Sequence, residues 1–378
     1  MKKTFIFIMI LCICGMILQG CDKVKVKSIA AGQNYSLVLM SNGELWAAGR
    51  NDYDKAGIKD EEKINVFLRV LQGVEAVSAG EGHTLVLKNG GILAGAGDAM
   101  KFGKPDPAIT ANTEEKGIWV NLMEDVKKIS AGRTHSLVVK NDGSLWGVGY
   151  NTWGSLGTEE YVELYHNFVR VLENVNAAWA GMSHSLALKD DGTLWVTGYN
   201  NSGELGIGCE EAEEYDEEMD HRHIRKWTYA ADGVKAAAAG SSYSLILKKD
   251  GTLWAAGNNS WGKLGTGDRK ERCEFVRVLT EVSSMAAGGS HSMAVKKDGT
   301  LWVAGNNEHG QLGTGDIENR YEFTEVLADV SSVAAGETHS MALKKDGSLW
   351  VTGGNFYGAL GLSDNEDRNT WTRVLLSE

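Results

Sequence analysis

The sequence contains a repeated unit, and histidine occupies the same position in most copies of that unit, shortly after an Ala-Gly step. Imidazole is a common metal ligand. The five copies are His83, His135, His184, His291 and His339. Two further copies of the same position carry Tyr35 and Tyr243 instead. A position that accepts tyrosine is better suited to hydrogen bonding and packing in a turn than to metal binding. We therefore expect no metal ring and no cofactor.

A run of acidic residues is inserted in the fourth repeat unit, with the sequence EEAEEYDEEMD over residues 210–220. His221 and His223 follow it directly. Clustered carboxylates can bind Ca²⁺ or meet a basic partner, but such a run is more often a solvated loop. The spacing matches no defined calcium loop, so the sequence favours a solvated loop over a metal site.

Motifs that would indicate catalysis are absent from the sequence. It contains no Gly-x-Ser-x-Gly elbow, no His-Glu-x-x-His motif and no phosphate-binding loop. The 47 glycines belong to predicted turns, and we expect the protein not to be an enzyme. Its formal charge of −12 argues against nucleic acid as a partner, because phosphates require a basic surface.

Aromatic residues gather at a position that varies between the copies, four residues after the glycine that ends a Trp-containing segment. They lie in loops of the form Asn-Asn-x-x-Gly, and they make large rigid contacts of the kind that binding centres favour. The candidate partner-binding residues are Tyr53, Trp153, Trp261, His309, Phe356 and Tyr357. The alternative is that each ring packs on its own neighbouring loop.

An internal repeat must position these residues, because the segment 286–314 is written again 48 residues earlier and 48 residues later. A period of this length indicates an array of like units. Seven copies of the Ala-Gly step are present, at Gly32, Gly80, Gly132, Gly181, Gly240, Gly288 and Gly336. The copies of an Asn-Gly or Asp-Gly turn between two apolar runs also number seven, which predicts a hairpin in every unit.

Four short strands are predicted in each unit, and in one copy they cover residues 275–279, 282–287, 292–296 and 301–304. One such sheet cannot bury both faces, whereas sheets stacked radially hide them. The sequence therefore predicts an all-β, seven-bladed β-propeller with a closed ring, and an open solenoid is the rival. The tryptophan after each turn is expected to pack between blades. If the strands 275–279 and 282–287 are neighbours, the C-terminal strand at 371–375 completes the first blade.

The order of motifs is similar to the repeats of the regulator of chromosome condensation family. In this order they are Ala-Ala-Gly, His-Ser, an apolar strand, Asp-Gly-x-Leu-Trp, Gly-Asn-Asn and Gly-x-Leu-Gly, over residues 24–375. The resemblance implies a seven-bladed propeller. The second unit departs from the pattern, lacks Gly-Asn-Asn and carries Pro105 and Pro107 in an enlarged loop, so its blade is expected to be distorted or locally mobile.

The N-terminus has the pattern of an export signal, with Lys2 and Lys3 before an apolar stretch that ends at Cys21. Residues 18–21, Leu-Gln-Gly-Cys, resemble the lipobox of bacterial lipoproteins. That resemblance implies a signal peptide over 1–20, lipidation of Cys21, a tether over 21–26 and a propeller over 27–378. An uncleaved N-terminal anchor is the alternative. Both place the folded part outside the cytoplasm, at the bacterial cell membrane.

Cys209 and Cys273 are the cysteines that remain beyond the signal and its lipid attachment site. They fall at comparable places in adjoining repeats, in loops predicted to share a face. A disulfide between them is one option outside the cytoplasm, and two free thiols is the other.

Together these patterns predict a membrane-anchored, extracytoplasmic binding or scaffold protein that recognises a protein partner through an aromatic-rich propeller face. The similar family includes a nuclear nucleotide-exchange factor and a secreted inhibitor of β-lactamase, so fold alone does not assign function. An exported domain would meet no cytoplasmic GTPase, which argues against exchange activity. The alternatives are recognition of a cell-surface glycan and inhibition of an exported enzyme.

Overall fold

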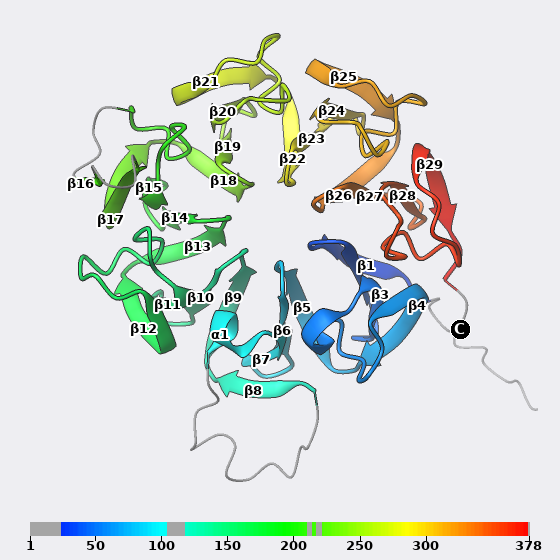
Figure 1. Cartoon of the computed structure of the whole chain (residues 1–378), viewed down its shortest axis with the longest axis horizontal. Helices are drawn as coiled ribbons and strands as arrows, with labels where there is room; N and C mark the ends of the chain where they lie inside the picture. The colour runs from blue at the N-terminus through cyan, green and yellow to red at the C-terminus, as the bar shows by residue number, and fades with distance from the viewer. Residues whose placement is uncertain (1–23, 104–117, 210–213, 217–220, 377–378) are drawn as a thin grey trace, which may run out of the picture.

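The chain forms a ring of seven β-sheets around a central channel, as Figure 1 shows for the computed structural model. The structure describes residues 24–103, 118–209, 214–216 and 221–376. Six sheets have four antiparallel strands and one has five, each formed by a continuous stretch of sequence. The predicted seven-bladed β-propeller is therefore confirmed.

The three inner strands of each blade have five or six residues, whereas the outermost strands vary from four residues in β8 to eleven in β17. The innermost are β1 (Val26–Ala31), β5 (Val74–Ala79), β9 (Val126–Ala131), β13 (Val175–Ala180), β18 (Val234–Ala239), β22 (Val282–Ala287) and β26 (Val330–Ala335). The second are β2 (Tyr35–Met40), β6 (His83–Lys88), β10 (His135–Lys140), β14 (His184–Lys189), β19 (Tyr243–Lys248), β23 (His291–Lys296) and β27 (His339–Lys344). The third are β3 (Leu45–Arg50), β7 (Ile92–Gly97), β11 (Leu145–Tyr150), β15 (Leu194–Tyr199), β20 (Leu253–Gly257), β24 (Leu301–Gly305) and β28 (Leu349–Gly353). The outermost are β4 (Lys63–Leu71), β8 (Val120–Met123), β12 (Leu164–Leu172), β17 (His221–Ala231), β21 (Arg272–Leu279), β25 (Arg320–Leu327) and β29 (Arg368–Val374).

The Asp-Gly turn explains the hairpin between the second and third strands. In blade 6, Gly299 has φ +95°, a conformation that glycine adopts without steric cost. The carboxylate of Asp298 accepts a hydrogen bond from the Thr300 amide at 2.8 Å. The Thr300 hydroxyl in turn accepts one from the Trp302 indole at 2.9 Å, and the Lys296 ammonium lies 3.7 Å from the centre of that ring. The turn thus also orients the tryptophan.

The C-terminal strand does not complete the first blade, and that expectation is wrong. β29 pairs with β28 in blade 7, and β21 likewise pairs with β20 rather than with β22. The short link between residues 279 and 282 therefore joins the outer strand of one blade to the inner strand of the next. A two-residue link can also close a hairpin, but here it crosses from the outer strand of one sheet to the inner strand of the next.

Apolar packing between blades closes the ring instead. Seven hydrophobic clusters occur, and each draws its residues from two neighbouring blades. The cluster between blades 7 and 1 joins Met341 and Val351 to Val38 and Phe67. The tryptophan of a blade packs against the cluster that this blade shares with the preceding one. Trp302 of blade 6 and Trp350 of blade 7 are examples. Packing between blades is therefore confirmed for five of the predicted tryptophans, which are Trp46, Trp195, Trp254, Trp302 and Trp350.

A glycine of each Gly-x-Leu-Gly loop receives an aromatic ring from the outer strand of the next blade. Gly361 has φ +66°, and a Cβ atom there would lie 2.4 Å from the Phe67 ring. The same contact recurs between Gly206 and Phe275 and between Gly313 and Trp371. Backbone bridges accompany these contacts, including one from Leu362 to Val66 across the ring closure.

The recurring histidines lie buried and donate to or accept from a serine of the following blade. The Nε2–Oγ distances are 2.7 Å for His83–Ser136, 2.7 Å for His135–Ser185, 3.0 Å for His184–Ser244, 2.8 Å for His291–Ser340 and 2.9 Å for His339–Ser36. The Ser136 hydroxyl donates its own proton to the Lys101 carbonyl at 2.7 Å, so the His83 imidazole is the donor at Nε2. The structure thus assigns the histidines a structural role between blades.

Blade 2 keeps four strands despite its unusual sequence, and its outer strand β8 has four residues. A helical turn, α1 (Ala99–Phe102), replaces the Asn-Asn loop, and its Phe102 side chain is buried. The enlarged loop with Pro105 and Pro107 lies outside the described residues. In blade 4, β16 (Glu214–Asp216) adds a fifth strand against β17. Most of the acidic run 210–220 also lies outside the described residues.

Replacing Gly361 with alanine should destabilise the ring at its closure. The residue would be strained at positive φ and would collide with the buried Phe67 ring, so we expect a loss of about 2 to 4 kcal/mol in unfolding free energy. Gly315→Ala is the matched control, since Gly315 has φ +88° with nothing within 4 Å, and it should lose about 1 kcal/mol. Chemical denaturation of both variants measures the difference. Equal losses would show that the aromatic contact carries no stability.

Acid should destabilise the propeller below the ordinary histidine pKa. Burial lowers the pKa of His83, His135 and His291 to about 3 and that of His184 and His339 to about 4. The unfolded chain binds these protons near pH 6.5 and the folded chain does not, so unfolding is favoured as pH falls from 6.5 toward 4. Each histidine contributes about 1.4 kcal/mol per pH unit in that window. Burial raises the pKa of Glu204 and Glu337. These two groups bind protons more tightly in the folded chain and so stabilise it as the pH falls, but they are fewer than the five histidines.

Thermal melts at pH 7 and pH 5 test this expectation. The melting temperature should fall at pH 5, and His339→Tyr, which copies the residue type of blades 1 and 5, should fall less. A melting temperature that is unchanged between the two pH values would contradict the assignment of neutral, buried imidazoles.

Candidate functional site

The loops between the third and fourth strands emerge on one face of the ring, together with the turns after the Ala-Gly steps. Figure 1 shows these loops, with the helical turn α1, on the side that faces the viewer. Lysine side chains connect these loops to the turns that follow the Ala-Gly steps. Lys55 lies in a loop and donates to the carbonyl of Glu81, which lies in such a turn, at 2.9 Å. We call this side of the molecule the loop face.

A buried asparagine side chain fixes the loop of every blade except blade 2, where α1 replaces it. In blade 6, Asn307 Oδ1 accepts from the Leu312 amide at 2.9 Å, and Nδ2 donates to the Thr314 hydroxyl at 3.0 Å. The same bond to an amide five residues later recurs at Asn51, Asn151, Asn200, Asn259 and Asn355. Because the amide satisfies several backbone groups at once, the loops are held in one conformation while their tips vary.

Three of the predicted partner-binding residues are prominently exposed on this face. The exposed fractions are 72% for Tyr53, 70% for Phe356 and 37% for Trp261. His309 is also exposed, and its Nδ1 lies 3.0 Å from the Asp367 carboxylate of blade 7. These four residues are available for contact with a partner.

The other two predicted residues pack against neighbouring blades. Trp153 meets the Tyr199 ring edge-on at 5.5 Å and the His223 ring at 6.0 Å. Tyr357 lies under the Arg50 guanidinium at 4.8 Å and contacts Phe356 at 4.9 Å. The structure brings together Phe356 and Tyr357 of the six. The other four stand on blades 1, 3, 5 and 6, so the predicted aromatic ring is a set of separate positions.

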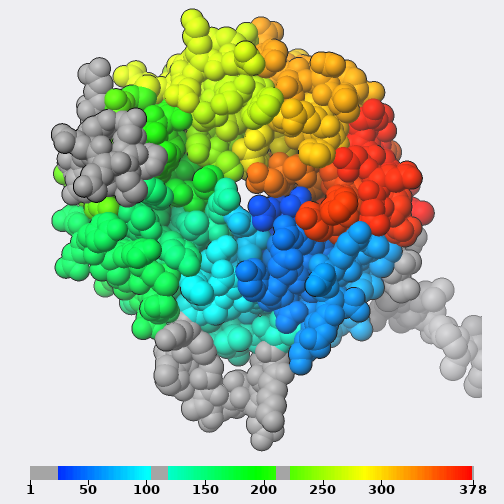
Figure 2. Space-filling view, viewed as in Figure 1, coloured from blue at the N-terminus to red at the C-terminus, as the bar shows by residue number. Residues whose placement is uncertain are grey.

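The mouth of the channel holds a second set of variable residues, which sequence reasoning missed. They directly follow the Ala-Gly steps and line a recess of about 110 Å³, and they are Gln33, Glu81, Arg133, Met182, Ser241, Gly289 and Glu337. Figure 2 shows this recess as a hollow at the centre of the face. Arg133 forms an ion pair with Glu81, and burial raises the pKa of Glu337.

Buried polar residues beneath the mouth were also missed. They occupy the variable position of Gly-x-Leu-Gly, where Lys263 donates to the Ser241 carbonyl at 3.0 Å. Burial lowers the pKa of Lys55 and of Lys263 to about 8. The signal for both sets was present in the sequence as variation at a fixed place in each repeat, but only the ring brings those places together.

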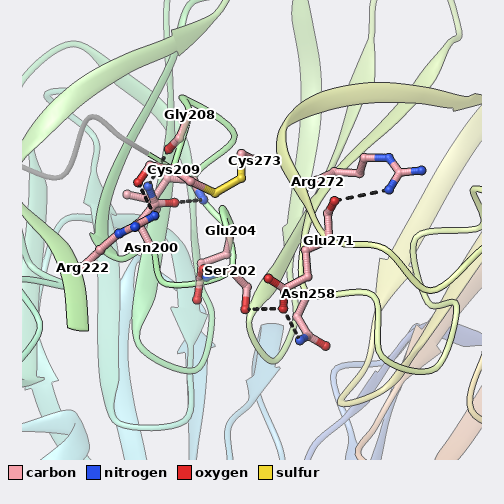
Figure 3. The surroundings of a disulfide bond; sticks show 11 residues. Asn200, Ser202, Glu204, Gly208, Cys209, Arg222, Asn258, Glu271, Arg272 and Cys273 are labelled. Atoms are coloured by element: carbon pink, nitrogen blue, oxygen red, sulfur yellow. Dashed lines mark hydrogen bonds between the residues drawn. A yellow bond between two sulfur atoms is a disulfide. The ribbon is translucent and has the colours of Figure 1, made fainter. Parts of the chain in front are cut away.

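Blades 4 and 5 are joined by a disulfide between Cys209 and Cys273, whose Cα atoms lie 5.2 Å apart. Of the two options left by the sequence, the structure has the disulfide. Cys209 lies in a loop as predicted, but Cys273 is in strand β21. Figure 3 shows a polar cluster at this seam, where the Glu271 carboxylate accepts from the Ser202 hydroxyl and from the Asn258 amide at 2.9 Å each.

The described residues meet the requirements of neither a metal site nor a membrane-spanning helix. Over residues 24–103, 118–209, 214–216 and 221–376, no group of three or more His, Cys, Asp or Glu is placed to hold a metal ion. Within the same ranges, no helix has the length and apolar character needed to cross a membrane.

A model described as the RCC1-like domain matches residues 126–377, more than half of the chain, and a model of the regulator of chromosome condensation (RCC1) repeat matches residues 26–54. The chain belongs to the RCC1-like family. The resemblance seen in the repeat motifs is confirmed.

Curated relatives share one stretch of RCC1-like repeats with this chain. E3 ubiquitin-protein ligase HERC2 of Homo sapiens is 33% identical over 150 residues, covering 36% of this chain and 3% of that protein. Protein RCC2 homolog of Xenopus laevis is 30% identical over 149 residues, covering 36% and 28%. The chain therefore spans only a small part of the length of these RCC1-like relatives.

Solved structures of RCC1-like proteins share the fold. Yeast RCC1 (Prp20), solved in complex with Kap60, superposes with a TM-score of 0.74 at 18% identity, covering 89% of this chain and 84% of that chain. Human WBSCR16 superposes with a TM-score of 0.70 at 20% identity, covering 88% and 93%. At this level of identity the likeness concerns the fold alone.

Proposed function

We propose that this protein is a membrane-anchored, extracytoplasmic binding or scaffold protein that holds a protein partner on its loop face. One observation carries the proposal. Tyr53, Trp261 and Phe356 expose large aromatic side chains on rigid loops, and Phe356 stays 70% exposed although its ring contacts Tyr357 at 4.9 Å. Exposed aromatics on a preorganised surface are typical of binding centres, because little conformational entropy is lost on contact.

The general role agrees with the solved relatives. Yeast RCC1 was crystallised with Kap60 bound, and Prp20p of Saccharomyces cerevisiae was studied for binding to Gsp1p and histones. Those partners belong to those proteins. What supports the proposal here is that an RCC1-like propeller can hold another protein, while the chemistry of this loop face is its own.

The proposed location depends on the N-terminal pattern and agrees with the disulfide. The signal over 1–20 and the lipid site Cys21 lie outside the described residues, so they stay predictions. A disulfide between Cys209 and Cys273 is typical of proteins that reside outside a reducing cytoplasm. The first strand begins at Val26, which would place the propeller close to a membrane that holds Cys21.

Mass spectrometry of the protein purified from its native membranes tests the location. We expect a chain that starts at Cys21, with added diacylglycerol and with Cys209 and Cys273 oxidised to a disulfide. Cys21→Ser should leave the protein unlipidated, so its mass should lack the diacylglycerol that the wild-type chain carries. A wild-type chain that retains residue 1 and free thiols would contradict the proposed export.

Alanine substitution of the exposed aromatic residues tests the partner face. The triple variant of Tyr53, Trp261 and Phe356 should capture its partner from cell-envelope extract at least about tenfold less well, because these side chains supply anchor contacts. Leu68→Ala with Tyr229→Ala is the matched control, since both residues are exposed on outer strands. Quantitative mass spectrometry of cross-linked complexes provides the measurement.

Equal capture by the wild type and the triple variant would refute the loop-face proposal. A glycan array separates the alternative class of ligand, because aromatic platforms also stack on sugars. Binding to a defined glycan that the triple variant loses, without any captured protein, would replace the protein-partner proposal with glycan recognition.

A further inference from the structure

A cavity of about 220 Å³ opens on the loop face beside the channel mouth. Blade 3 supplies Trp153 to its wall, and blade 4 supplies His184, Tyr199 and Glu204. Met182 lines both this cavity and the channel recess, so the two hollows are adjacent. The cavity is large enough for a small organic molecule and combines an aromatic wall with one acidic group.

The acidic group has an unmet hydrogen-bonding capacity. Glu204 is fully buried, and its Oε2 accepts from the Ser202 amide at 2.9 Å. Its Oε1 is buried with no hydrogen-bond partner among the described residues. A buried carboxylate oxygen without a donor is costly, and such costs are commonly tolerated where a ligand supplies the missing group.

The equivalent positions in other blades do not share this feature. The variable residue of Gly-x-Leu-Gly is serine at 155, lysine at 263, glutamine at 311 and alanine at 359. Lys263 is satisfied by the Ser241 carbonyl, and Gln311 Nε2 donates to Asn306 Oδ1 at 2.6 Å. The repeat therefore does not need an acid at this position, and Glu204 is a specific property of blade 4.

Aromatic rings form the wall beside this carboxyl group. Trp153 meets Tyr199 at 5.5 Å with an interplanar angle of 66°, so the two rings form a corner rather than a stack. Such corners favour organic cations, because the ring faces carry negative charge. The Ser244 hydroxyl donates to the Glu204 carbonyl at 2.6 Å, so His184 donates its Nε2 proton to Ser244 at 3.0 Å. His184 stays neutral because burial lowers its pKa to about 4. It therefore adds no positive charge to the cavity.

We propose that this cavity binds a small organic cation with a primary ammonium group, in which one N–H donates to Glu204 Oε1 and the alkyl chain lies against Trp153. A primary ammonium supplies both the charge and the donor that the carboxylate lacks, whereas a quaternary ammonium supplies only the charge. The site does not depend on the proposed protein partner, and either could exist without the other.

The charged groups around Glu204 set the expected pH dependence. Burial raises the pKa of Glu204 to about 7, the nearby Glu271 also raises it, and Lys263 lowers it. Burial and these carboxylates raise the pKa of Tyr199, so its hydroxyl stays neutral. An alkylammonium ligand keeps its charge over pH 6 to 8. Its affinity should therefore follow ionisation of Glu204 and be about tenfold higher at pH 8 than at pH 6.

Calorimetric titration with n-butylammonium chloride, using the full mature chain, tests the proposal. We expect saturable binding at pH 8 that is at least tenfold tighter than that of tetramethylammonium or of neutral n-butanol. Glu204→Gln keeps the shape and removes the charge, and it should lose at least tenfold in affinity. Trp153→Ala should also weaken binding.

Glu271→Gln is the matched control, because Glu271 is an exposed carboxylate at the same seam, and it should stay within about threefold of the wild type. Melting temperatures of all variants show whether each one folds. No binding of n-butylammonium by the wild type, equal binding by Glu204→Gln, or equal affinity for n-butanol would each overturn the proposal.

Discussion

The burial of apolar sheet faces between neighbouring blades is the constraint on which this structure depends. One blade exposes two such faces, and each of the seven clusters fills the space between two blades. The ring must therefore close, because an open end would leave a face such as that of Val38 and Phe67 in water. Closure by packing explains why blade 1 needs no strand from the C-terminus.

Recurring contacts made by histidine, glycine and asparagine then align the blades so that this packing is specific. A buried histidine bonds to the next blade, and a glycine at positive φ admits an aromatic ring such as Phe67 against Gly361. A buried asparagine such as Asn307 holds the loop in six of the seven blades. Since these contacts hold the scaffold together, the loop tips and channel-mouth positions are free to vary. Function is therefore expected where the copies differ, at Tyr53, Phe356 and Glu204.

Much of the fold followed from the repeat, but the site followed only in part. The periodic Ala-Gly and Asp-Gly steps predicted seven sheets because strand and turn chemistry is local. The same patterns misassigned β29, since a two-residue link is compatible with different pairings. Of the aromatic residues, Tyr53 and Phe356 proved exposed, whereas Trp153 became a cavity wall. Side-chain exposure depends on the neighbouring blade, which no single repeat specifies.

The sequence by itself determined the number of sheets and the hairpin turns, because each depends on residues close together in one repeat. Only the tertiary structure decided the pairing of Cys209 with Cys273, the ring closure and the orphaned oxygen of Glu204. Those features arise between blades, where residues distant in the chain meet. The energy of such contacts depends on geometry that a one-dimensional pattern does not contain.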